Sequence, residues 1–228
     1  MNYNIGEQQI VDAFSGFLKD KFRDAFGYNA RYSVGSFAGK QDEVFSDFFA
    51  GTLSKNILIE FKEKESGFAS EKRKILRKAL CSHIDGGFAK ISRDCHFSGW
   101  NSGGEQIQIE LTSYIDKVCP LFDLSESQRE LFHPETIYPH RYFISAFLEE
   151  GLGVSSDEFR AYIHFLDWLR DNGAPLGVTE FKAILYSYDA EGELIGTSFR
   201  NLDEALALVS KPDVSLVSNS APKGLGGR

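Results

Sequence analysis

Three charged side chains with the chemistry to cleave a phosphodiester bond lie between residues 47 and 62. Asp47 stands at the edge of one expected strand, and Glu60 and Lys62 end the apolar stretch 56–62. Side chains alternate between the two faces of a strand, so Glu60 and Lys62 share one face, roughly 6.6 Å apart along it. Charges that end an otherwise buried strand are costly unless they pair or bind a metal. The segment is therefore a candidate functional site.

Mg²⁺ or Mn²⁺ is the cofactor that these residue types favour. Mg²⁺ takes oxygen ligands and keeps several waters, so carboxylates on two neighbouring strands can hold it. The ion polarises a phosphodiester and lowers the pKa of a bound water, and a lysine beside it can orient that water and stabilise developing charge. Asp47 and Glu60 would hold the ion and Lys62 would serve catalysis. Glu7 could add a carboxylate if the first helix crosses the sheet edge.

The segments that would position these residues alternate between helix and strand. In chain order we expect a helix over 5–26, strands over 31–34, 44–50 and 56–62, a helix over 71–84 begun by Ser70, a loop containing Trp100, and a strand over 106–111. Apolar residues at three- and four-residue steps predict the helices, and alternation predicts the last strand. This order indicates an α/β or α+β fold with a mixed sheet flanked by helices.

The second half of the chain is acidic, with ten acids against four arginines between residues 123 and 171. We expect a helix over 140–150, a helix opened by a capping box of Ser155 and Glu158, a β-hairpin over 181–199 and a short helix over 202–209. Residues beyond 211 are rich in Ser, Pro and Gly, which is typical of disorder. The domain prediction is a core over 5–115, a helical and hairpin extension packed on it over 116–210, and a tail over 211–228.

Basic residues gather immediately after the candidate site, although the whole chain carries a formal net charge of −8. Residues 62–94 contain nine Lys or Arg against five acids, a local charge of +4 that leaves −12 for the remainder. The helix over 71–84 is expected to bury Ile75 and to display Lys72, Arg73, Lys74, Arg77 and Lys78. Such a face could contact the phosphates of DNA or could be a plain solvated surface. Lys72 and Lys74 are equal candidates for assisting the site.

The sequence resembles the PD-(D/E)xK nuclease superfamily over roughly residues 5–115. The resemblance rests on Asp47, on Glu60-Phe61-Lys62 at the end of an apolar strand, and on the order of helices and strands. It implies a restriction-endonuclease-like core with Asp47 and Glu60 as metal ligands, Lys62 as the catalytic lysine and Glu7 as the first-helix glutamate that some members use. Ser46 stands where the family has its namesake proline. By analogy the activity would be DNA cleavage in repair, recombination or antiviral defence.

A function without catalysis is an alternative to the nuclease hypothesis. Composition alone yields roughly one Glu-x-Lys by chance, and a second one occurs at Glu180-Phe181-Lys182, at the start of an expected strand. The alternative function is an inactive, nuclease-fold interaction subunit of a larger defence or repair complex. Its acidic second half would bind a protein partner or a second copy of the chain. The sequence does not distinguish DNA from RNA as substrate.

The cysteines and the hydropathy favour a cytoplasmic protein. Cys81, Cys95 and Cys119 are few and odd in number, which predicts reduced thiols rather than a disulfide framework. Cys81 and Cys95, with His83 and His96, lack the clean spacing of a zinc site. No stretch is apolar enough for a membrane span, and the first residues do not resemble a signal peptide.

Overall fold

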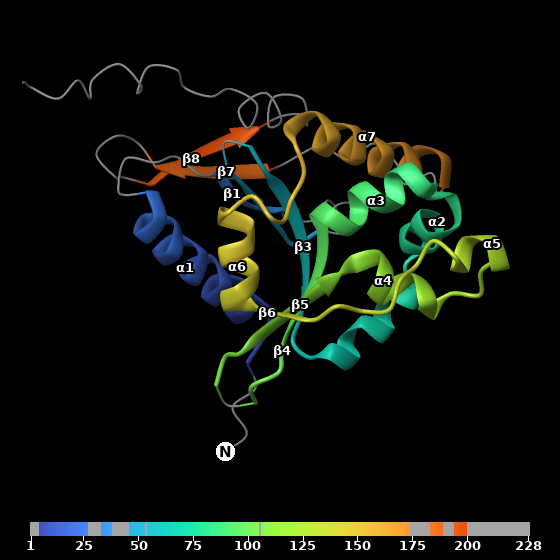
Figure 1. The fold of residues 1–228 in the computed structure, drawn as a ribbon, viewed down its shortest axis with the longest axis horizontal. Helices are drawn as coiled ribbons and strands as arrows, with labels where there is room; N and C mark the ends of the chain where they lie inside the picture. The colour runs from blue at the N-terminus through green and yellow to red at the C-terminus, as the bar shows by residue number, and fades with distance from the viewer. Residues whose placement is uncertain are drawn as a thin grey trace, which may run out of the picture.

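A mixed β-sheet with helices on both faces organises the chain (Figure 1). The computed structural model describes residues 5–26, 33–37, 46–52, 54–104, 106–173, 183–188 and 194–199. The elements in chain order are α1 (Glu7–Phe26), β1 (Ser33–Phe37), β2 (Phe48–Gly51), β3 (Asn56–Lys62), the 3₁₀ helix η2 (Glu65–Arg73), α2 (Ile75–His83), α3 (Gly86–Cys95), β4 (His96–Asn101), β5 (Ile109–Ser113), α4 (Tyr114–Val118), the 3₁₀ helix η3 (Cys119–Leu121), α5 (Glu126–Arg129), β6 (Tyr138–Pro139), α6 (His140–Leu148), α7 (Ser156–Gly173), β7 (Ala183–Tyr188) and β8 (Leu194–Phe199).

The strand order is β6-β5-β4-β3-β2-β1-β7-β8. β3 and β4 pair in parallel, and every other neighbouring pair in this sheet is antiparallel. A parallel pair needs a long crossover, and here η2, α2 and α3 supply it between β3 and β4. The predicted α/β class, a mixed sheet flanked by helices, is confirmed.

Strand β3 directs alternate residues toward opposite faces of the sheet. Ile57, Ile59 and Phe61 pack in the apolar cluster formed with α1 and α6, whereas Leu58 packs in the cluster formed with α2, α3, α4 and α7. Figure 1 shows these two helical layers on either side of the sheet. Alternation therefore directs Glu60 toward the α2 layer, on the face that it shares with Leu58.

The segment predicted as one helix over 71–84 is interrupted at Lys74. Lys74 has an extended backbone (φ −82°, ψ 118°) between η2 and α2, and the Ser70 hydroxyl donates to the Gly67 carbonyl at 2.8 Å instead of starting a helix. The interruption turns the following residues: Ile75 is 66% exposed and Arg77 only 1%. The predicted burial of Ile75 and display of Arg77 are both wrong.

The region predicted as a loop before residue 106 contains two regular elements. Helix α3 begins where the Asp85 carboxylate accepts the Phe88 backbone N–H at 2.8 Å. Strand β4 follows it directly and lies beside β3. β1, β2 and β5 form in the predicted order with shifted ends, and β3 coincides with residues 56–62.

Elements of the second half share the sheet and the apolar clusters of the first half. The β7–β8 hairpin is present as predicted and pairs with β1, α6 packs against α1, and α7 packs against α2 and α3. The capping box forms, with the Ser155 hydroxyl and the Glu158 carboxylate reaching each other's backbone N–H. The boundary at residue 115 stays a prediction. Residues 180–182, the helix over 202–209 and the tail lie outside the described residues.

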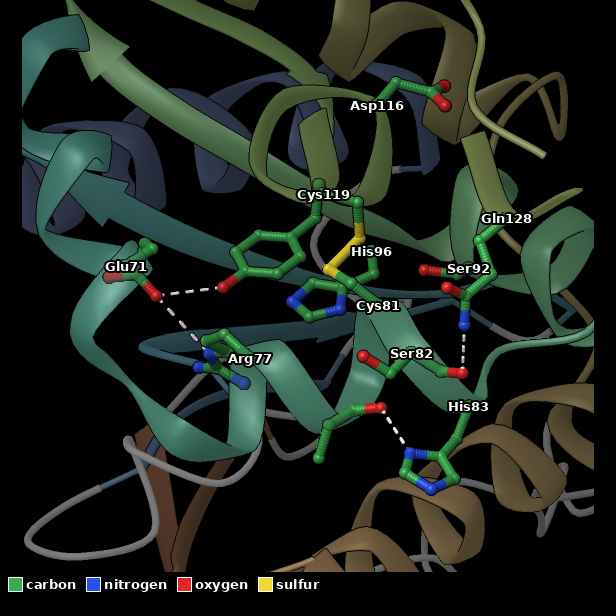
Figure 2. The surroundings of a disulfide bond; sticks show 12 residues. Glu71, Arg77, Cys81, Ser82, His83, Ser92, His96, Asp116, Cys119 and Gln128 are labelled. Carbon is green, nitrogen blue, oxygen red and sulfur yellow. Dashed lines mark hydrogen bonds and ion pairs between the residues drawn. A yellow bond between two sulfur atoms is a disulfide. The ribbon is translucent and has the colours of Figure 1, made fainter. Parts of the chain in front are cut away.

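A disulfide between Cys81 and Cys119 joins α2 to η3 (Figure 2). The prediction of reduced thiols is therefore wrong for these two residues, and Cys95 is the buried free thiol. Packing of α2 against η3 brings together two residues separated by 38 positions, a proximity that cysteine spacing does not reveal. Cytoplasmic localisation stays a prediction, and the cysteines no longer support it. In the described part of the chain, no helix combines the length and apolarity needed to cross a bilayer.

Removing the disulfide is expected to lower the free energy of unfolding. A cross-link over 38 positions restricts the unfolded chain, so the Cys81→Ser/Cys119→Ser variant should lose roughly 2–4 kcal/mol in urea unfolding. Under denaturing, non-reducing conditions one cysteine per chain should be alkylated, and all three after reduction. Three reactive thiols without reductant would contradict the cross-link.

Candidate active site

The four residues that the sequence selects lie together where β3 ends. The Lys62 ammonium is 2.8 Å from Glu60 Oε1 and 3.6 Å from Glu7 Oε1, at the start of α1. The backbone N–H of Phe61, between Glu60 and Lys62, donates to Asp47 Oδ2 at 2.6 Å. Asp47, Glu60, Lys62 and Glu7 therefore converge, although they come from two elements, α1 and β3, and from the segment directly before β2.

Asp47 lies directly before β2 and continues its pairing with a side chain. Backbone pairing between β2 and β3 ends at Phe48 and Ile59. Beyond this pair, the Phe61 N–H of β3 donates to the Asp47 carboxylate instead of to a backbone carbonyl of β2. Burial raises the pKa of Asp47 to about 7, and the negative charge of Glu60 adds to the rise. Lys62 and the Phe61 N–H oppose it. A nearby cation would therefore stabilise the ionised form of Asp47 near neutral pH.

Glu60 is buried and already surrounded by positive charge. Lys62 and Lys74 lie 2.8 and 3.0 Å from its Oε1, and Arg77 lies 3.3 Å from its Oε2. Burial alone would raise the pKa of Glu60, but Arg77, Lys62 and Lys74 outweigh it and lower the pKa to about 2. Glu60 is therefore ionised throughout the physiological range.

A buried polar layer lies beneath Glu60, and sequence reasoning missed it. Glu71 is fully buried, and its Oε2 accepts from the Tyr114 hydroxyl at 2.9 Å and from Arg77 Nε at 3.4 Å. The Arg77 guanidinium lies 5.3 Å from the Tyr114 ring centre, and the His96 ring stacks on Tyr114 with the ring centres 4.2 Å apart. Figure 2 shows Glu71 and Arg77 joined beside His96 and the disulfide.

The five basic residues predicted to contact DNA divide into two groups. Arg77 is buried against Glu60 and Glu71, so the prediction that it contacts phosphate is wrong. The Lys74 side chain is 32% exposed and contacts both glutamates, which selects it over Lys72 as a residue of the site. Lys72, Arg73 and Lys78 are exposed. For these three residues, phosphate contact stays a prediction.

The carboxylates fit a divalent ion in residue type but not in their present contacts. Among the described residues, no group of three or more His, Cys, Asp or Glu is arranged to hold a metal. One or two carboxylates can suffice for Mg²⁺, and Asp47 and Glu60 supply hard oxygen ligands. However, the Glu60 oxygens are in contact with Lys62, Lys74 and Arg77. An ion could reach Glu60 Oε1 only after one ammonium group withdraws.

Comparison of the chain with protein-family models, with curated proteins and with solved structures found no match.

Proposed function

We propose that the chain is a Mg²⁺- or Mn²⁺-dependent nuclease that hydrolyses phosphodiester bonds of DNA. The observation that carries this proposal is the convergence of Asp47, Glu60 and Lys62 at one end of β3, with Glu7 at its rim. The order of helices and strands, α1-β1-β2-β3-α2-α3-β4-β5, supports it because it contains the order on which the nuclease resemblance rests.

Each residue of the site has a distinct part in this chemistry. Asp47 and Glu60 would hold the metal, which supplies Lewis acidity toward the phosphate and acidifies a bound water. Lys62 is buried along its stem, with 12% of its side chain exposed, and stays protonated because Glu60 and Asp47 raise its pKa. It can therefore orient a water through an N–H and stabilise negative charge on the phosphoryl oxygens.

Solvent reaches the site on the side of Glu7 and Lys74. Their side chains are 45% and 32% exposed, whereas Glu60 and Arg77 are almost completely buried. A DNA strand would approach from this side, and the exposed Lys72, Arg73 and Lys78 would contribute phosphate contacts that weaken with salt.

The test is a cleavage panel of plasmid, linear duplex, single strands and RNA, each incubated with Mg²⁺ or Mn²⁺. The wild type should cleave a DNA substrate, and chelation with EDTA should abolish cleavage. Asp47→Asn keeps an oxygen that can accept the Phe61 N–H but removes the charge, so it should be inactive while folded. Cleavage by Asp47→Asn at the wild-type rate would remove the proposal, and cleavage of RNA alone would change the substrate.

An interaction subunit without activity is the second candidate, and the contacts of Glu60 favour it. A carboxylate held by three cations can be a purely structural ion cluster. Such a protein would bind neither Mg²⁺ nor Mn²⁺ at Asp47, so metal binding separates the two functions without depending on the choice of substrate.

Mn²⁺ is expected to raise the melting temperature of the wild type at pH 8 but not that of Asp47→Asn. Binding at roughly 100 times Kd stabilises by about 2.7 kcal/mol, or about 5–10 °C for a chain of this size. The folded-state pKa of Asp47, about 7, exceeds its ordinary value of 3.8, so the metal-free protein should lose stability as pH rises from about 4 to 7.

Differential scanning fluorimetry measures both effects, and Asp94→Asn is the matched control. Asp94 also has a pKa raised by burial but interacts with Lys90, Arg93 and Lys55 outside the site. Its replacement should leave the response to Mn²⁺ intact. An equal rise in Asp47→Asn and the wild type would place the ion elsewhere.

A further inference from the structure

The oxygens of Glu60 and Glu71 are divided between a closed side and an accessible side. On the closed side, Arg77 contacts Oε2 of Glu60 at 3.3 Å and Oε2 of Glu71 at 3.4 Å. On the accessible side, the Lys74 ammonium lies 3.0 Å from Oε1 of Glu60 and 2.8 Å from Oε1 of Glu71. One lysine thus bridges two buried carboxylates from different elements.

Glu71 Oε1 is a buried acceptor without a matching donor. Glu71 is 0% exposed, and its Oε1 has no hydrogen bond within the described residues. Lys74 lies close enough for a charge contact but outside hydrogen-bond geometry, and Lys62 is 3.8 Å away. A buried carboxylate oxygen normally has a directed partner, so this atom indicates a position suited to another cation.

Of the cations around the two glutamates, Lys74 is the one most able to leave. Its side chain is 32% exposed, compared with 12% for Lys62 and 1% for Arg77. Its extended backbone at the junction of η2 and α2 places the side chain at the rim of the site. The lysine stem can therefore turn into solvent without breaking a helix.

We propose that Lys74 occupies the metal position in the metal-free protein, bridging Glu60 and Glu71, and that Mg²⁺ or Mn²⁺ binds by displacing it. This inference rests on the proposed function and adds Glu71 as a metal ligand. Both ions favour carboxylate oxygen, and the two Oε1 atoms already meet at one ammonium group.

The exchange predicts that Lys74 and the metal compete. In Lys74→Gln the competing ammonium is gone, so Mn²⁺ should bind roughly tenfold tighter, equivalent to about 1.4 kcal/mol. Isothermal titration calorimetry and the EPR signal of free Mn²⁺ measure the change. Lys78→Gln, an exposed lysine of α2 one turn further along the chain, is the matched control and should keep the wild-type affinity. Glu71→Gln should weaken binding.

Lysine labelling tests the displacement itself. Acetylation of Lys74 by an N-hydroxysuccinimide ester, followed by mass spectrometry, should increase several-fold when Mg²⁺ is added, whereas acetylation of Lys78 should not change. Unchanged or weaker Mn²⁺ binding by Lys74→Gln would overturn the exchange and leave the proposed function standing. Absence of binding in both the wild type and Lys74→Gln would overturn both, and binding by the variant alone would support the exchange.

Discussion

Replacing Lys62 by methionine is expected to lower DNA cleavage by about 10²–10³-fold, the usual cost of losing one donor to developing charge. Lys62 lies at the meeting point of Glu60, Asp47 and Glu7, so no other group can take its position without rearrangement. Methionine keeps much of the apolar stem, whose Cβ lies 3.1 Å from where a Cβ on Gly67 would stand. Glu60 would retain Lys74 and Arg77, so the fold should persist.

Single-turnover cleavage rates and melting temperatures of Lys62→Met and Lys64→Met measure this prediction. Lys64 lies two residues later, pairs with Glu63 at the surface and is 68% exposed, so its replacement should leave the rate within about twofold, as for a surface pair. A folded Lys62→Met protein that cleaves at one third of the wild-type rate or faster would exclude a catalytic role for this lysine.

Local pattern was sufficient to predict β3 and the convergence at its end. The apolar run makes residues 56–62 a strand, and the alternation of side chains places Ile59 and Phe61 opposite Glu60. Asp47 and Phe49 occupy alternate positions on the segment entering β2, and Phe49 packs on the α2 layer. Side chains alternate across any strand, so the face that Glu60 occupies follows from its position between Ile59 and Phe61.

The polar layer beneath Glu60 could not be predicted, because its partners are distant in sequence. Arginine and glutamate are rarely fully buried unless paired, and helical periodicity does not indicate that Arg77 contacts both Glu71 and Glu60 of β3. The extended backbone of Lys74 interrupts the helix directly before α2, and Arg77 on α2 is buried.

The sequence pattern does not predict strand β4, because several of its residues are determined by contacts with β3 and the α2 layer rather than by an apolar run. Gly99 lies against the Phe61 ring, and a Cβ there would stand 2.6 Å from a ring carbon. Glycine is therefore required, although it weakens the strand signal. His96 and Ser98 also occupy the strand, facing the α2 layer with Glu60. The strand is specified by what it contacts rather than by its own apolar pattern.

Replacing Arg77 by methionine is expected to destabilise the fold by about 3–5 kcal/mol, the cost of breaking a buried ion pair by removing one partner. Arg77 contacts both glutamates on their closed side and packs over Tyr114. Methionine keeps the stem but leaves Glu71 without its guanidinium. Urea unfolding at pH 7 measures the loss, and Arg73→Met, an exposed arginine, should cost less than about 0.5 kcal/mol.

The dependence of this loss on pH identifies its cause. The folded-state pKa of Glu60, about 2, lies below its ordinary value of 4.5 because Arg77, Lys62 and Lys74 outweigh burial. Its contribution to stability is therefore complete above pH 4.5 and is lost as pH falls toward 2. Without Arg77 the Glu60 pKa should rise, so the stability gap between the wild type and Arg77→Met should narrow below pH 4.5. If the difference in unfolding free energy between the wild type and Arg77→Met stays constant from pH 7 to pH 3, the loss comes from packing alone. A difference below 1 kcal/mol at pH 7 would show that the polar layer does not support the site.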